Sequence, residues 1–333
     1  MLANPFSVWP VGAALVCWIK SLMDVILHIG AHRTATTAFQ QYMHDNAEWL
    51  AASGTGFWGP EHTRAGVFSG MYEMRPGVGN TRKMGAELVA EMLRVETDKG
   101  VQRLIISDEN LMGSVRQNIR DELLYPAVAT RITHAMTVLG GRVRQIVIAP
   151  RSLETYWCSA LAYGVGRGAP VPSRAKLTRI AASRRTWRDV IMDIADAAPA
   201  PVLTVTLFEK ISTRPDEMLS AMGIEAVPKA VRRGPVNVSP DLPQLRRVLR
   251  DRGADHTALP FGMGRWNPFT NAEHDALREH YADDMMWLTA GASGVAKLTE
   301  DRLSERAGKN LPRGAQCKGQ TDEFQERHVA RPG

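Results

Sequence analysis

A short polar loop between two apolar stretches carries the residues best suited to chemistry in this chain. Residues 24–29 are an apolar, β-rich run, residues 30–37 are small and polar, and residues 38–50 show the pattern of an amphipathic helix. A strand, a loop and a helix in this order are typical of a phosphate-binding loop, because backbone N–H groups and the positive end of the helix face an anion there. The segment therefore predicts an anion-binding site.

The loop departs from the Walker pattern of ATP-binding proteins at its most important position. In the pattern G-x-x-x-x-G-K-[ST], Gly30 fits the first glycine and Thr37 fits the final hydroxyl. Ala35 stands at the second glycine, Thr36 stands at the lysine, and the strong positive charge of the loop is Arg33 instead. A nucleoside triphosphatase without the lysine loses its contact to the β- and γ-phosphates. The loop therefore suits an anion other than ATP with magnesium.

The same segment resembles the 5′-phosphosulfate loop of the sulfotransferases that use 3′-phosphoadenosine 5′-phosphosulfate (PAPS). The family loop reads as a basic residue, Ser or Thr, Gly, Thr, Thr after a strand. These positions here hold Arg33, Thr34, Ala35, Thr36 and Thr37. Two of them depart from the family, because its usual lysine is Arg33 and its usual glycine is Ala35. The resemblance implies that this loop binds the 5′-phosphosulfate group of PAPS.

A second motif extends the resemblance. After its third core strand the family has an arginine followed eight residues later by a serine, and both bind the 3′-phosphate of the nucleotide. Arg151 and Ser159 have this spacing, and about two helical turns separate them, so a guanidinium and a hydroxyl can hold one phosphate from two sides. Many family members close the nucleotide site with a late basic–glycine loop. Arg232, Arg233 and Gly234 are similar to that loop and are candidates for binding the nucleotide; a solvated basic turn is the alternative.

The resemblance also implies roles in the reaction. Sulfuryl transfer moves a group in line between two oxygens while negative charge builds on the leaving oxygen, so the protein must supply position and fixed positive charge. The loop amides with Thr36 and Thr37 would hold the 5′-phosphate, and Arg33 would lie near the leaving oxygen. Because the pKa of an arginine is too high for proton donation, the expected role of Arg33 is electrostatic. No metal is expected.

An acceptor hydroxyl needs a general base, and Glu109 is the first choice. It follows the apolar run 103–107 almost directly, where relatives also have a carboxylate. The alternative is an exposed strand-end or helix-capping glutamate. His62, in the polar segment after the first helix, and His32, within the loop, are rival bases, although His32 is expected to pack beneath the loop.

Four apolar runs must supply the scaffold that positions these residues. The runs lack polar alternation, which predicts strands covered on both faces; they are residues 24–29, 103–107, 144–149 and 202–208. Helical patterns separate them, so the expected fold is α/β: three α/β/α layers around a central, mainly parallel sheet. Polar residues at the carboxyl ends of such strands lie in the ligand crevice. Glu209, after the fourth run, is interpreted as a structural carboxylate that pairs with a cation.

Composition limits the classes of function. The 333 residues carry a formal net charge of +6, and the basic residues are dispersed, which suits an enzyme of anionic substrates better than a nucleic-acid surface. Three cysteines, Cys17, Cys158 and Cys317, have no C-x-x-C spacing. They predict neither a zinc site nor a disulfide framework, so a reducing, cytoplasmic location is expected.

The chain is expected to contain one sulfotransferase-like domain over residues 23–290. Residues 1–22 are an uncertain extension, because Met23 stands directly before the first strand and is a candidate start; a signal anchor is the alternative. The apolar part of this segment is short for a membrane span, so membrane association is not expected. Residues 304–333 are polar and Gly-rich and predict a disordered tail.

The leading hypothesis is a PAPS-dependent sulfotransferase that acts on a hydroxyl or an amine. A P-loop kinase or nucleotide hydrolase is the rival enzyme class, and a nucleotide-binding scaffold that has lost its chemistry is the rival without activity. The sequence does not identify the acceptor, which could be a carbohydrate, a lipid or a metabolite. Its recognition is expected from residues 55–80, 110–125 and 160–185.

Overall fold

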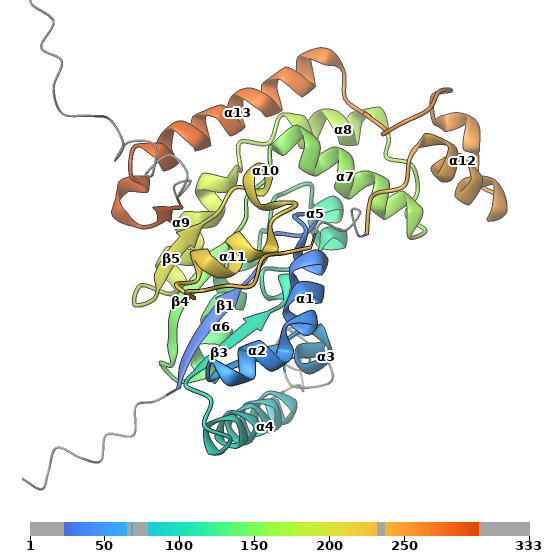
Figure 1. Ribbon diagram of the computed structural model, residues 1–333. Coiled ribbons are helices and arrows are strands. Elements are labelled where there is room, and N and C mark those ends of the chain that lie inside the picture. The colour runs from blue at the N-terminus through green and yellow to red at the C-terminus, as the bar shows by residue number, and fades with distance from the viewer. Residues whose placement is uncertain (1–22, 65–67, 69–78, 232–236, 300–333) are drawn as a thin grey trace, which may run out of the picture. The chain divides into compact units, whose positions relative to one another are not determined.

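The computed structural model describes residues 23–64, 68, 79–231 and 237–299, and these belong to one compact unit (Figure 1). A sheet of six parallel strands lies at its centre in the order β2-β3-β1-β4-β5-β6. The strands are β1 Asp24–His28, β2 Thr55–Trp58, β3 Arg103–Ser107, β4 Val143–Ile148, β5 Val202–Val205 and β6 Lys297–Leu298. The predicted three-layer α/β/α architecture with a parallel sheet is confirmed.

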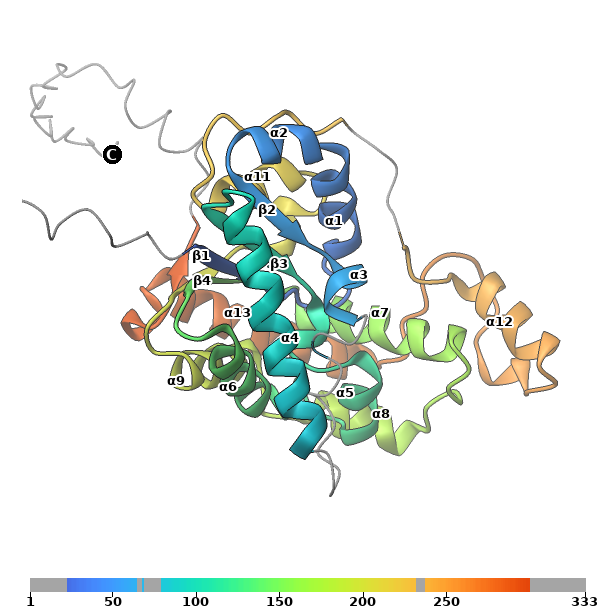
Figure 2. The same cartoon turned by 90° about the horizontal axis from the view of Figure 1, so that it is seen from below.

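Helices cover both faces of this sheet (Figures 1 and 2). In β1, Ile26 packs into one buried cluster while Val25 and Leu27 pack into the other. The first face is covered by α1 Thr36–Asp45, α2 Ala47–Ala52, α10 Phe208–Ile211 and α11 Pro215–Ala221. The second face is covered by α4 Gly79–Asp98, α6 Val128–Leu139, α7 Leu153–Gly166, α8 Arg174–Ala181, α9 Trp187–Ala197 and α13 Asn271–Thr289, and α12 Leu242–Asp251 packs on α7 at the periphery. Burial on both faces explains why these strands show no polar alternation.

Short elements complete the connections. They are α3 Pro60–His62, η3 Glu109–Leu111, α5 Val115–Asp121, η4 His256–Ala258 and η5 Ala292–Gly294. The sequence predicts a helix that begins near Ser239 or Asp241 and a last helix capped by Thr270. The helices α12 and α13 begin there, because Asp241 and Thr270 each accept a hydrogen bond from the backbone N–H three residues later.

The strand order brings the candidate residues to one edge. The central strand β1 lies between β3 and β4, and the chain builds the sheet on the β3 side before it crosses to the β4 side. In open α/β sheets such a reversal leaves a crevice at the carboxyl ends of the strands. Gly30 follows β1, Glu109 follows β3 and Arg151 follows β4. All three loops therefore open at the same edge.

Three local expectations are wrong. The helix expected over residues 38–50 is divided at Asn46, whose side chain donates to the carbonyl oxygen of Tyr42, the acceptor that a continuing helix would use. Residues 54–59, expected as a turn because of their glycines, contain β2, which pairs with β3. The last strand ends at Val205, so Glu209 belongs to α10.

Candidate functional site

The loop between β1 and α1 is open to an anion. Arg33 and Ala35 have φ angles of 64° and 62°, in the left-handed region, and no side chain caps α1. The hydroxyls of Thr34 and Thr36 donate to the carbonyl oxygen of Ala31 at 2.6 and 3.2 Å, which folds the loop back on itself. Among the described residues no acceptor faces the N–H groups of residues 33–35. These groups are free to bind an anion at the positive end of α1.

Ala35 has a left-handed conformation that favours glycine, because an L-residue there costs about 1–2 kcal/mol. We expect Ala35→Gly to raise the free energy of unfolding by about 1 kcal/mol, the relief of strain exceeding the entropy that glycine adds to the unfolded chain. Urea titration measures this change. The matched control is Ala90→Gly in the exposed interior of α4, which should lower the same free energy by about 1 kcal/mol. Equal destabilisation by both substitutions would contradict the strain argument.

Arg33 lies against α7 and the segment before α12. Its Nε donates to Ser159 Oγ at 3.2 Å, and its Nη2 donates to the Asn237 carbonyl oxygen at 2.8 Å and to Ser239 Oγ at 2.9 Å. Its guanidinium carbon lies 5.0 Å from the ring centre of Tyr163. Burial lowers the pKa of Arg33 from its ordinary value. The loop arginine and the serine of the second motif, predicted from separate parts of the sequence, are therefore in direct contact.

Arg151 joins the same group from the end of β4. Its Nη1 donates to the carbonyl oxygen of Arg33 at 2.9 Å, and its Nε donates to Thr155 Oγ1 at 3.0 Å. Burial, and to a smaller degree the nearby charges of Arg265 and Arg33, lower the pKa of Arg151 to about 10. The side chain therefore stays charged at neutral pH although the residue is only 8% exposed.

Neither arginine has an acidic ion-pair partner in the part of the chain that the structure describes. The nearby Glu209 attracts Arg151, but its oxygens accept from Ser152 N at 3.0 Å and from Tyr281 OH at 3.1 Å. Glu209 is therefore held by neutral donors rather than by the cation that the sequence predicts. Buried positive charge without a counter-charge is unfavourable. The site is consequently suited to an anionic ligand that supplies the missing charge.

Glu109 packs directly on the loop. A Cβ atom on Gly30 would lie 2.9 Å from Glu109 Cβ, so Gly30, with a φ of 97°, lets the two segments meet. Glu109 Oε1 accepts from Arg64 Nη2 at 3.0 Å. Its Oε2 is buried and has no partner among the described residues. One carboxylate oxygen is thus fixed by Arg64, while the other has no hydrogen-bond donor among the described residues.

Asp108, the neighbouring carboxylate, is fully engaged elsewhere. It is buried and accepts from Thr63 Oγ1 at 2.5 Å, from Arg64 Nη2 at 2.7 Å and from Asn110 N at 3.0 Å. These bonds hold Arg64 beside Glu109. Asp108 therefore has a structural role.

The two rival histidines also have their hydrogen-bond partners. The backbone N–H of His32 donates to Tyr125 OH at 2.9 Å, His32 Nδ1 lies 2.9 Å from the same hydroxyl, and Nε2 lies 3.2 Å from Asn110 Oδ1. Burial lowers the pKa of His32. A neutral ring with its proton on Nε2 satisfies both contacts, so His32 holds the loop in place. His62 Nδ1 lies 3.0 Å from Glu61 Oε1.

A third histidine, which the sequence did not single out, lies beneath the loop. His28 is buried at the end of β1, with Nδ1 2.8 Å from Ser107 Oγ; Gln40 donates to that hydroxyl at 3.3 Å. His28 Nε2 has no partner among the described residues. It lines a narrow pocket, bordered also by Thr34 and Ile211, with room for about one water molecule.

His28 should make stability depend on pH. Burial lowers the pKa of His28 from 6.5 to about 3, so the unfolded chain binds the proton first. The contribution of neutral His28 to the free energy of unfolding is fully present above pH 6.5. As the pH falls below 6.5, this contribution decreases by about 1.4 kcal/mol per pH unit, which amounts to about 2 kcal/mol at pH 5. Urea titrations at pH 7.5 and 5 should show a loss of stability in the wild type that is about 2 kcal/mol smaller in His28→Gln, because His32, whose pKa burial also lowers, keeps its own contribution. His62→Gln, at a half-exposed histidine, is the control and should keep the loss. An unchanged pH dependence in His28→Gln would refute this role.

The structure adds residues that sequence reasoning missed. Tyr163 lies four residues after Ser159, so helical spacing could have placed both on one face of α7. Asn237 and Ser239 have no local signal for their contacts with Arg33. They follow Arg232, Arg233 and Gly234, the predicted closing loop, which lies outside the described residues.

Comparisons of the chain with protein-family models, with curated proteins and with solved structures found no match. The fold and the loop define the class: an α/β protein with a candidate anion-binding loop at the carboxyl edge of a parallel sheet. In the described ranges no helix is long and apolar enough to cross a membrane. The same ranges contain no group of three His, Cys, Asp or Glu side chains that could hold a metal ion.

Proposed function

We propose that this protein is a sulfotransferase that moves a sulfuryl group from PAPS to a hydroxyl, or an amine, of an acceptor. The observation that carries the proposal is the convergence of Arg33, Arg151 and Ser159 on an open loop at the end of β1. Both guanidiniums lack a carboxylate partner within the described residues, so a ligand with separate negative groups fits them.

The residues present fit the two anionic ends of PAPS. The free N–H groups of residues 33–35 suit the 5′-phosphosulfate, together with the hydroxyl of Thr37. The Thr36 hydroxyl, also expected from the sequence to hold this group, donates to the Ala31 carbonyl oxygen in this structure. Thr37 is exposed at the start of α1, and its hydroxyl has no bond among the described residues. Arg151 and Ser159 suit the 3′-phosphate. The family resemblance adds Arg232, Arg233 and Gly234 as a closing contact.

In the proposed transfer reaction, Arg33 and Glu109 have separate roles. PAPS supplies an activated sulfuryl group. Arg33 stabilises negative charge on the oxygen that leaves, without giving up its proton. Glu109 removes the proton of the acceptor hydroxyl through Oε2, the oxygen that Arg64 leaves free. The acceptor itself, whether carbohydrate, lipid or metabolite, stays undefined.

A kinase or nucleotide hydrolase is the alternative enzyme class, and one contact weighs against it. Such an enzyme needs a strand-end carboxylate for magnesium, and Asp108 is the candidate. In this structure Arg64 and Thr63 occupy its oxygens. A scaffold without activity, the other alternative, would bind the nucleotide and turn nothing over.

The proposal is tested by calorimetric titration with 3′-phosphoadenosine 5′-phosphate (PAP) and, separately, with ADP, without added metal. We expect PAP to bind about a hundredfold more tightly than ADP, and Arg151→Ala to remove about that factor for PAP alone, because it deletes a charged donor to the 3′-phosphate. Arg179→Ala, which breaks an exposed ion pair with Glu122, is the matched control and should change neither affinity. Equal affinities for PAP and ADP, or a magnesium-dependent preference for ADP, would contradict the proposal.

A further inference from the structure

The segment of residues 260–265, here called the tip, exposes two apolar side chains. Phe261 is 91% exposed and Met263 is 82% exposed. Gly262 and Gly264 alternate with them at φ angles of 128° and 84°. Single exposed apolar residues are common on protein surfaces, but two large ones within three positions need a reason.

The tip is held in shape by α12. Arg246 donates through Nη1 to the Pro260 carbonyl oxygen at 2.5 Å and through Nη2 to the Gly262 carbonyl oxygen at 2.7 Å. Its guanidinium carbon lies 6.0 Å from the ring centre of Phe261. The N–H of Leu242 donates to the Gly264 carbonyl oxygen at 2.9 Å. The apolar side chains are therefore presented by an ordered frame, and little further ordering is needed for binding.

Basic residues outnumber acidic ones in the tip and its frame. Residues 241–265 contain five arginines and three aspartates. Asp241 and Asp255 are used as helix caps, and Asp251 lies 3.7 Å from Arg247. Arg250 and Arg265 are exposed and have no ion-pair partner among the residues that the structure describes. The segment that carries the tip and its frame therefore has a net positive charge.

Other arginine contacts fix this frame to the body of the protein. Arg252 donates to the carbonyl oxygens of Val165 and Ala169, at the end of α7. Figures 1 and 2 both show α12 beyond this end of α7, at the periphery of the described residues. At this peripheral position the tip can contact an extended flat surface.

We propose that the tip inserts Phe261 and Met263 into the surface of a membrane that contains anionic lipid, with Arg247 and Arg250 of α12 at the level of the headgroups. Apolar side chains among arginines are the combination that binds such an interface. Two side chains give far less contact than the roughly 800 Å² per partner of a stable protein pair, which disfavours a second copy of the chain.

The inference does not depend on the sulfotransferase proposal. It departs from the sequence-based expectation of no membrane association, which considered only residues 1–22. Partial insertion of two side chains, without a spanning helix, gives reversible binding.

The test is sedimentation of the full-length protein with vesicles of phosphatidylcholine, with or without about 30% phosphatidylserine. We expect binding to the anionic vesicles only. The double substitution Phe261→Ser with Met263→Ser should weaken this binding about thirtyfold. Raising the salt from about 0.05 to 0.5 M should weaken it about tenfold, because it screens the arginines.

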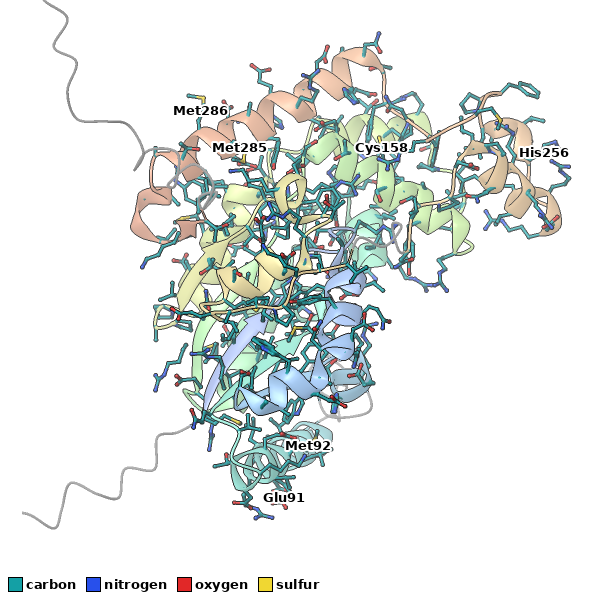
Figure 3. The ribbon with its side chains drawn as sticks, in the orientation of Figure 1. Glu91, Met92, Cys158, His256, Met285 and Met286 are labelled. Carbon is teal, nitrogen blue, oxygen red and sulfur yellow. The ribbon has the colours of Figure 1, made fainter. Side chains whose placement is uncertain are left out.

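Met286→Ser is the matched control. Met286 is 72% exposed on α13, and Figure 3 shows it on the opposite side of the described residues from His256, which lies close to the tip in the chain. This substitution should leave vesicle binding unchanged. Equal unfolding midpoints would show that all variants are folded, as exposure of these side chains predicts.

Three results would overturn the proposal. The first is no binding to anionic vesicles at low salt. The second is full binding by the double variant, and the third is an equal loss in Met286→Ser. Self-association of the wild type that disappears in the double variant, measured by analytical ultracentrifugation without vesicles, would instead assign the tip to a second copy of the chain.

Discussion

Arg33→Ala is expected to slow the chemical step, in which PAPS loses its sulfuryl group and becomes PAP, about a thousandfold at saturating nucleotide. The reason is electrostatic: a preorganised donor aimed at the developing negative charge contributes a factor of about 10²–10³ to the rate. In the present structure Ser159, Ser239 and the Asn237 carbonyl oxygen hold the guanidinium, so little reorganisation remains when the charge forms. Alanine also removes a counter-charge for the nucleotide, and PAP affinity should fall with it.

Arg33→Lys tests whether the positive charge alone is sufficient or whether the hydrogen-bond geometry of the guanidinium is also needed. Lysine restores the charge and is the usual residue in the sulfotransferase loop that this segment resembles, but it cannot bond Ser159, Ser239 and Asn237 together. We therefore expect it to keep much of the turnover. PAP formation from saturating PAPS, followed by nucleotide chromatography, measures both variants with water or simple alcohols as acceptor. Turnover in Arg33→Ala within tenfold of the wild type would refute the assigned role.

Glu109→Gln is expected to lower acceptor-dependent transfer about a thousandfold while PAP affinity changes less than about twofold, because general bases contribute about 10²–10⁴. The substitution keeps an oxygen for the 3.0 Å bond from Arg64 and removes the basicity of Oε2. It therefore tests proton removal with little change in shape. A purely structural Glu109 would retain its turnover.

Transfer to a panel of phenols and alcohols, with radiolabelled sulfuryl donor, measures the Glu109 effect. Glu61→Gln is the control, because Glu61 is a half-exposed carboxylate that contacts His62 and His44. It should leave transfer and PAP affinity unchanged. Full activity of Glu109→Gln would mean that another group is the general base. Loss of activity together with loss of PAP affinity would show that Glu109 acts in binding.

Local patterning was sufficient to predict the layers of the fold. The strand over residues 103–107 was predicted with its observed bounds, because burial on both faces leaves an unbroken apolar run. The starts of α12 and α13 were readable because Asp241 and Thr270 cap their own helices through bonds three residues away. β2 was missed because its strand character comes from pairing with β3, which lies far along the chain.

The candidate site was only partly readable in the same way. Residue types and spacings indicated the loop, Arg151, Ser159 and Glu109, since strand ends and helical turns have fixed dimensions. Their contacts depend on the packing of distant segments: Arg33 bonds Ser159 across 126 positions and Ser239 across 206. Which oxygen of Glu109 stays free depends on Arg64, which Asp108 positions. Hydrogen bonds form only within a few tenths of an ångström, and such distances are set by the strand order and by the packing of the whole sheet.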